Sequence, residues 1–202
     1  MEDGKRRTVK YYPFKNLLLA MFCLALGGSV RAGDLTNRPA NWAQPVTVAG
    51  IGNCYQLTTN FYRGAQPTAE GMKHLHAMGI KTVISLRYLH SDKDVVAGTG
   101  LKSVRLKMEP WHGDEDEVVL FLKAATDTNN LPVFVHCERG ADRTGTLCAM
   151  YRITVCGWTK EQALDEMKHG GFGFNPMWQN LVKDVEKADI AKIKRRAGLA
   201  EK

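Results

Sequence analysis

The chain has 202 residues, of which 44% are hydrophobic and 24% charged, and its formal net charge is +7. This composition predicts one compact domain with a terminal appendage and excludes collagen-like, coiled-coil, low-complexity and disordered chains. Five cysteines are too few for a disulfide scaffold of this size.

The first 32 residues have the features of a secretory signal peptide. Five basic residues precede an apolar stretch of 14 residues, Leu17 to Val30, and Val30-Arg31-Ala32 offers a cleavage point. A helix of that length rises only about 21 Å, short of the roughly 30 Å hydrocarbon core, so an uncleaved membrane anchor is the weaker alternative. We therefore expect an exported protein, periplasmic or extracellular, with no stable membrane span.

Removal of residues 1–32 takes away six basic and two acidic residues, which leaves a net charge of about +3. A charge of this size does not indicate nucleic-acid binding. Cys148 and Cys156 lie in one predicted helix, about 12 Å apart along its axis, too far to pair with each other. We expect no disulfide framework, and the sequence leaves open whether Cys54 pairs.

The remaining chain divides into an extended lead-in, residues 33–53, and a domain, residues 54–198. The lead-in has no hydrophobic period, so its order depends on docking against the domain. In the domain, short apolar runs predict strands, and hydrophobic periods with N-caps at Thr68, Asp114 and Thr159 predict helices. The predicted strands are 54–57, 61–63, 82–86, 104–108 and 133–135, and the last predicted helix runs from Trp178 to Arg196.

Strands that alternate with helices predict an α/β fold, with a largely parallel central sheet and helices on both faces. Ligands bind at the carboxyl ends of the strands in such sheets. One strand, 133–135, runs directly into a segment that carries chemistry. This segment is His136, Cys137, Glu138, Arg139, Gly140, Ala141, Asp142, Arg143 and Thr144, and a helical pattern follows it.

Five residues separate Cys137 from Arg143, enough to curl so that backbone N–H groups point inward at the start of the following helix. Such a nest fits one tetrahedral oxyanion such as phosphate. The same amides and helix dipole favour the thiolate form of Cys137, a nucleophile. Arg143 can hold two phosphoryl oxygens at once, and Gly140 permits the tight backbone path. Thr144 can donate a hydrogen bond to the sulfur, and His136 can hold the loop from behind.

The segment HCERGADRTG resembles the signature loop of the cysteine-dependent protein tyrosine phosphatases, in which His-Cys, five residues, Arg and Ser or Thr follow one another. Fixed positions within a strand-loop-helix context make this motif specific. Residues 61–68 (FYRGAQPT) and 79–87 (GIKTVISLR) are similar to the amino-terminal half of the atypical dual-specificity phosphatases of bacteria, plants and fungi. The resemblance covers about residues 54–185.

The resemblance implies a phosphomonoester hydrolase that uses no metal and no other cofactor. Cys137 would attack phosphorus, an acid would protonate the leaving oxygen, and water would hydrolyse a phosphocysteine intermediate. The substrate would be a phosphorylated protein, carrying phosphotyrosine or phosphoserine and phosphothreonine, or a small phosphate ester such as an inositol phosphate or phosphoinositide. We expect a monomer.

Three carboxylates are candidates for the general acid. The family usually supplies an Asp roughly thirty residues before the cysteine, where this sequence has Glu109. Asp114, on a predicted loop nearer to Cys137, is the preferred candidate, although an ordinary helix N-cap explains it equally well. Asp142 is the third, because relatives such as the myotubularins carry an acidic Asp just before the arginine.

Other functions fit parts of this pattern. A phosphate-binding module without turnover would keep the loop and lack a placed acid, while rhodanese-like sulfurtransferases and arsenate reductases also cradle a cysteine in a loop. Trp111 and His112 are candidates to line the site. Cys148 either packs in the core or protects Cys137 through a reversible bridge.

Overall fold

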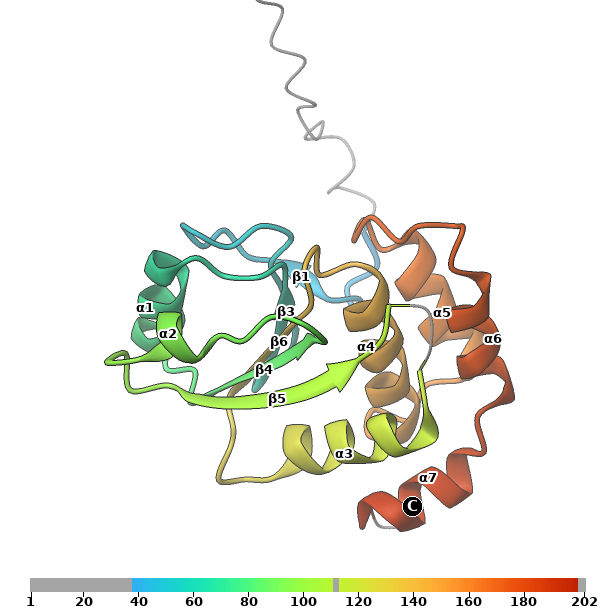
Figure 1. The fold of residues 1–202 in the computed structure, drawn as a ribbon. Helices are drawn as coiled ribbons and strands as arrows, with labels where there is room; N and C mark the ends of the chain where they lie inside the picture. The colour runs from blue at the N-terminus through green and yellow to red at the C-terminus, as the bar shows by residue number, and fades with distance from the viewer. Residues whose placement is uncertain (1–37, 111–112, 200–202) are drawn as a thin grey trace, which may run out of the picture. The chain divides into compact units, whose positions relative to one another are not determined.

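The computed structural model describes residues 38–110 and 113–199. The expected signal peptide, 1–32, and the site candidates Trp111 and His112 lie outside the described residues. Within them, strands form one mixed sheet in the order β1-β2-β3-β6-β4-β5, and Figure 1 labels β1, β3, β6, β4 and β5 in this order. The strands are β1 Gln44–Pro45, β2 Tyr55–Thr58, β3 Phe61–Gly64, β4 Thr82–Arg87, β5 Lys102–Met108 and β6 Val133–His136.

Four neighbouring strands, β3, β6, β4 and β5, run parallel, and β1 and β2 extend one edge antiparallel. The central strand β6 is buried on both sides, which explains its continuous apolar run. Gly64 at the end of β3 and Ser85 near the end of β4 both pair with His136. The segments that follow these strands therefore meet at one edge of the sheet.

Helices cover both faces of the sheet, as predicted. On one face α1 and α2 pack over Ile80, Val83 and Phe134; on the other, the longer set α3 to α7 encloses the larger core (Figure 1). The helices are α1 Ala69–Ala77, α2 Lys93–Val96, α3 Glu115–Thr126, α4 Asp142–Thr154, α5 Lys160–His169, α6 Gln179–Lys187 and α7 Ile190–Ala197.

The prediction of one helix from Trp178 to Arg196 is wrong, because the chain breaks between α6 and α7. Ala188 is extended, and Asp189 begins a new helix by accepting a hydrogen bond from Lys192 N at 3.0 Å. Lys160 Nζ donates to the carbonyl of Ala188 at 2.8 Å and so satisfies the end of α6. The apolar residues stay at helical spacing through both helices, so the hydrophobic period of the sequence does not reveal the break between them.

The described part of the lead-in, residues 38–53, contains β1 and docks on a buried ion pair. Arg152 of α4 and Glu166 of α5 form two hydrogen bonds of 2.8 Å, and Glu166 Oε1 also accepts from Ala43 N at 2.5 Å. Arg38 reaches the carbonyl of Gly170 at 2.8 Å. Residues 38–53 thus belong to the same compact unit as the domain.

Two expectations about the chain can be compared with this structure. The four described cysteines, Cys54, Cys137, Cys148 and Cys156, are all free thiols. Across residues 38–110 and 113–199, none of the helices combines the length and the apolar character that crossing a membrane requires.

Candidate active site

The loop between β6 and α4 holds Cys137 at the carboxyl edge of the sheet. Cys137 is 3% exposed and lines a hollow of about 370 Å³. The structure brings Glu138, Arg139, Asp142 and Arg143 to this hollow with it, and neighbouring segments add Pro110, Asn175 and Trp178.

Five successive carbonyl groups of the loop, those of residues 137–141, accept hydrogen bonds from other side chains or segments. The C=O and N–H groups of a trans peptide point in opposite directions, so these contacts turn the N–H groups of residues 138–142 toward the other side. The loop is thereby built as an anion nest. The donors are His136 Nδ1 to Cys137 at 2.9 Å, Gln66 N to Glu138 at 3.1 Å, Asn53 Nδ2 to Arg139 at 2.8 Å, and Arg63 Nη2 to Gly140 at 2.7 Å and to Ala141 at 3.5 Å.

Arg63 supports the loop from within the protein and was missed by the sequence analysis. It is 1% exposed, and its guanidinium lies 3.7 Å from the ring centroid of Phe172. A buried cation is stable only with such partners, here two carbonyls and an aromatic face. The signal available in the sequence was an arginine inside an otherwise apolar strand.

Gly140 has φ +70°, a conformation that favours glycine. A Cβ at this position would lie 2.3 Å from the carbonyl carbon of Gly64 and 2.5 Å from Ala65 N. The loop and the end of β3 therefore approach each other more closely than any side chain allows, which gives Gly140 the role that the sequence predicted.

Arg143 and Thr144 lie at the start of α4. Arg143 Nη1 donates to the carbonyls of Leu86 and Met108, at 3.3 and 3.4 Å, near the ends of β4 and β5. These contacts hold the guanidinium beside the hollow. Thr144 Oγ1 is buried and has no hydrogen-bond partner among the described residues, so its bond to the cysteine sulfur stays a prediction.

Asp92 is a second residue that sequence reasoning missed. Its side chain is fully buried, and Oδ2 lies 2.7 Å from His136 Nε2, while His136 Nδ1 faces the carbonyl of Cys137. Burial raises the pKa of Asp92, but the hydrogen bond and charge of His136, with help from Ser85 and His90, outweigh it and lower that pKa below its ordinary value. Asp92 thus fixes the orientation of the His136 imidazole, which in turn holds the carbonyl of Cys137 in the loop.

The structure separates the three candidate acids. Asp142 lines the hollow of Cys137, and its Oδ1 accepts from Asn175 N at 2.8 Å. Glu109 lines an adjoining hollow of about 340 Å³ that also contains Arg143. Asp114 is not among the described residues lining either one. It caps α3, and its N–H donates to Glu117 Oε2 at 3.2 Å, which confirms the predicted capping box. The identity of the acid stays a prediction.

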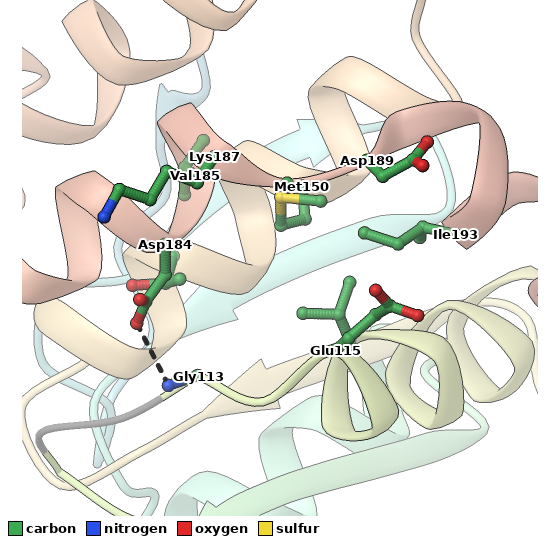
Figure 2. A pocket seen from close by; sticks show the side chains of 11 residues that line it. Gly113, Glu115, Met150, Asp184, Val185, Lys187, Asp189 and Ile193 are labelled. Carbon is green, nitrogen blue, oxygen red and sulfur yellow. Dashed lines mark hydrogen bonds between the residues drawn. The ribbon is translucent and has the colours of Figure 1, made fainter.

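The segment that carries Asp114 is anchored away from Cys137. Gly113 N donates to Asp184 Oδ2 of α6 at 3.3 Å, as the dashed line in Figure 2 shows. This contact lies at a separate hollow of about 230 Å³ bordered by α3, α4, α6 and α7, whose described lining includes neither Cys137 nor Arg143. Asp184 therefore holds Gly113, the neighbour of Asp114, at this separate hollow.

Cys148 lies in α4, one of the buried residues of the larger core. Burial raises the pKa of its thiol to about 11. It is therefore protonated at neutral pH, as expected of a core cysteine, and the alternative of a protective bridge to Cys137 stays a prediction.

Comparisons with known proteins bear on this site. A family model described as "DSP-PTPase phosphatase fused to NAD+ Kinase" matches residues 38–184. The chain is 38% identical over 184 residues to the dual specificity protein phosphatase TpbA of Pseudomonas aeruginosa, over 86% of this chain and 80% of TpbA. A crystal structure of TpbA has 32% sequence identity and a TM-score of 0.71, covering 79% of this chain and 98% of that one.

A Cys-to-Ser variant of TpbA in complex with phosphotyrosine has 31% identity and a TM-score of 0.72, covering 81% of this chain and 99% of that one. The chain belongs to the family of dual-specificity and tyrosine phosphatases, DSP-PTPase, that the model describes. It is a cysteine-dependent phosphatase, as the loop HCERGADRTG predicts. Family membership favours this activity over the sulfurtransferase, arsenate reductase and non-catalytic alternatives.

The support from Arg63 predicts that Arg63→Lys weakens the anion nest. A lysine lacks the fork and the planar stacking of arginine, and charge-assisted hydrogen bonds are worth about 1.5–3 kcal/mol. We expect vanadate to bind about 10- to 100-fold more weakly, measured by inhibition of p-nitrophenyl phosphate hydrolysis. Arg38→Lys, which changes an arginine outside the loop, is the control. Unchanged vanadate affinity in a folded Arg63→Lys protein would contradict this role.

The Asp92 carboxylate predicts a pH dependence of stability. The pKa of Asp92 is lower in the folded protein than its value in the unfolded chain, about 3.9. The stabilisation that this carboxylate contributes is therefore present above the unfolded pKa and is lost as the pH falls through the folded pKa. We expect Asp92→Asn to be less stable than wild type in urea at pH 6, with the difference shrinking toward pH 3. Asp94→Asn controls for the loss of one exposed charge. If the stability difference between Asp92→Asn and wild type stays the same from pH 6 to pH 3, the Asp92 carboxylate does not link stability to pH.

Proposed function

We propose that this chain hydrolyses phosphorylated proteins, with phosphotyrosine as a substrate, through a phosphocysteine on Cys137. The observation that carries the proposal is the loop whose carbonyls are held outward beside a cysteine and an arginine in one hollow. The dual-specificity name of TpbA and the phosphotyrosine complex of its variant support a phosphoprotein substrate.

In the reaction, Cys137 Sγ attacks phosphorus in line with the leaving oxygen. The N–H groups of residues 138–142 and the Arg143 guanidinium bind the three other phosphoryl oxygens and stabilise the charge of the transition state. An acid gives its proton to the leaving oxygen. Water then attacks the phosphocysteine, the S–P bond breaks, and the same carboxylate accepts the water proton, so that inorganic phosphate and the thiolate remain.

We also propose that the enzyme acts as a monomer outside the cytoplasm, in the periplasm or beyond it. The basic segment and apolar stretch of residues 1–32 support export. The described domain supports a soluble catalytic unit, because its helices pack their apolar faces on the two cores that flank the sheet.

A second candidate function is hydrolysis of inositol phosphates by the same chemistry. An inositol diphosphatase of Arabidopsis thaliana is 24% identical over 182 residues, covering 86% of this chain and 82% of that protein. Arg139 in the catalytic hollow is the observation behind this candidate, since a second cation there can hold another phosphate, whereas Glu138 and Asp142 in the same lining oppose one.

The nucleophile is tested with the full chain under reducing conditions. We expect wild type to hydrolyse p-nitrophenyl phosphate, vanadate to inhibit it, and Cys137→Ser to lose at least about a thousandfold in kcat while still binding phosphate. Cys156→Ser is the matched control for loss of a thiol outside the loop. If reduced wild type binds phosphate but does not hydrolyse p-nitrophenyl phosphate, the chain is a phosphate-binding module and the proposed enzyme activity is wrong.

The general acid is tested with Asp114→Asn, Asp142→Asn and Glu109→Gln. Removing the acid should lower kcat on phenyl phosphate about 10²- to 10⁴-fold and on p-nitrophenyl phosphate much less, because p-nitrophenolate leaves without a proton. Asparagine caps a helix as well as aspartate does, so Asp114→Asn separates acid catalysis from capping. If all three variants keep the wild-type ratio of the two rates, the acid is none of these residues.

A further inference from the structure

Exposed large apolar side chains lie on the segments that border the catalytic hollow and the hollow that adjoins it. Among the described residues that expose such side chains, Tyr88 is 45%, Leu89 is 92% and Met177 is 83% exposed. Tyr88 and Leu89 line the hollow that adjoins the catalytic one, and Met177 directly precedes Trp178, which lines the catalytic hollow itself. With Pro110 these residues form what we term the apolar rim: Tyr88, Leu89, Pro110, Met177 and Trp178.

The two hollows adjoin, because Pro110, Glu138 and Arg143 line both. A ligand whose phosphate lies in the loop can therefore extend past Arg143 toward Tyr88 and Leu89, and within the catalytic hollow it can reach Trp178. Each hollow thus has apolar rim residues in its lining.

The rim is held by hydrogen bonds to the catalytic framework. Arg105 donates to the carbonyls of Arg87 and Tyr88, at 3.2 and 2.5 Å. On the other side Met177 N donates to Asn175 Oδ1 at 3.0 Å, and Asn175 N in turn donates to Asp142 of the signature loop. We interpret these exposed apolar side chains as a binding surface because they lie next to the site and their backbone is held by hydrogen bonds.

The charges around the hollows are balanced. The described lining residues include three arginines and three carboxylates. Arg87 is paired with Glu138 at 3.1 Å, and Asp142 offsets one of the cations beside the nest. A ligand with many phosphates requires an excess of cations, and an anionic membrane requires a basic surface. The lining therefore suits one phosphoryl group within otherwise uncharged, apolar surroundings.

We infer that the apolar rim binds an extended phosphotyrosyl peptide with large apolar residues on both sides of the phosphorylated residue. This inference rests on the proposed function and narrows its substrate to phosphoprotein segments of this kind. The phosphotyrosine occupies the loop, one apolar flank covers Tyr88 and Leu89, and the other covers Met177 and Trp178.

The test compares kcat/KM for two phosphotyrosyl peptides, one with leucine and one with alanine at the two positions on each side. We expect the full-length wild type to prefer the leucine peptide about tenfold or more, since each covered apolar side chain contributes to binding. Leu89→Ser and Met177→Ser should each bring this ratio toward one. Leu120→Ser and Met78→Ser, which change exposed apolar residues of α3 and of the end of α1, should keep the ratio and the rate on p-nitrophenyl phosphate.

The outcomes separate this inference from the proposed function. Turnover of p-nitrophenyl phosphate with a leucine-to-alanine ratio near one, or a ratio that survives both rim substitutions, overturns the inference alone. Faster hydrolysis of inositol hexakisphosphate, or of phosphatidylinositol phosphate in phosphatidylcholine vesicles, also overturns it in favour of a small ester or a lipid. Absence of any turnover by reduced wild type overturns both.

Discussion

The site depends on one constraint: hydrogen bonds must hold the carbonyl groups of the loop pointing away from the phosphate. A nest for phosphate needs several N–H groups on one side, so the carbonyls of residues 137–141 must point to the other side, where each of them accepts a hydrogen bond. The donors come from Asn53, Arg63 and Gln66, far from the loop in sequence. The parallel pairing of β3 with β6 is what brings these segments to the loop.

The same constraint explains the buried charges behind the loop. Arg63 and His136 donate toward it, and each is compensated on its other side, by the ring of Phe172 and by the carboxylate of Asp92. Donors in this layer polarise the peptide groups whose N–H ends face the anion. A substitution in this layer therefore acts on phosphate binding through the loop, without touching the substrate.

Local patterns predicted much of this arrangement, and long-range contacts could not be predicted. The strands, the caps at Thr68 and Thr159, and the loop around Cys137 depend on residues close in sequence, and the structure contains them. Arg63 and Asp92 were missed because their partners lie 77 and 44 residues away. The break before α7 was missed because the apolar period continues across it. The choice among the three acids depends on tertiary placement, which sequence spacing does not fix.

The charge of the loop itself bears on substrate choice. In this chain two of the five residues between Cys137 and Arg143 are acidic, and one of them, Glu138, pairs with Arg87 outside the loop. These carboxylates remove the cationic excess that would attract a polyphosphate, while a single phosphate still meets the N–H groups and Arg143. The five residues between Cys137 and Arg143 therefore act on substrate choice through charge, and the apolar rim acts on it through contact area.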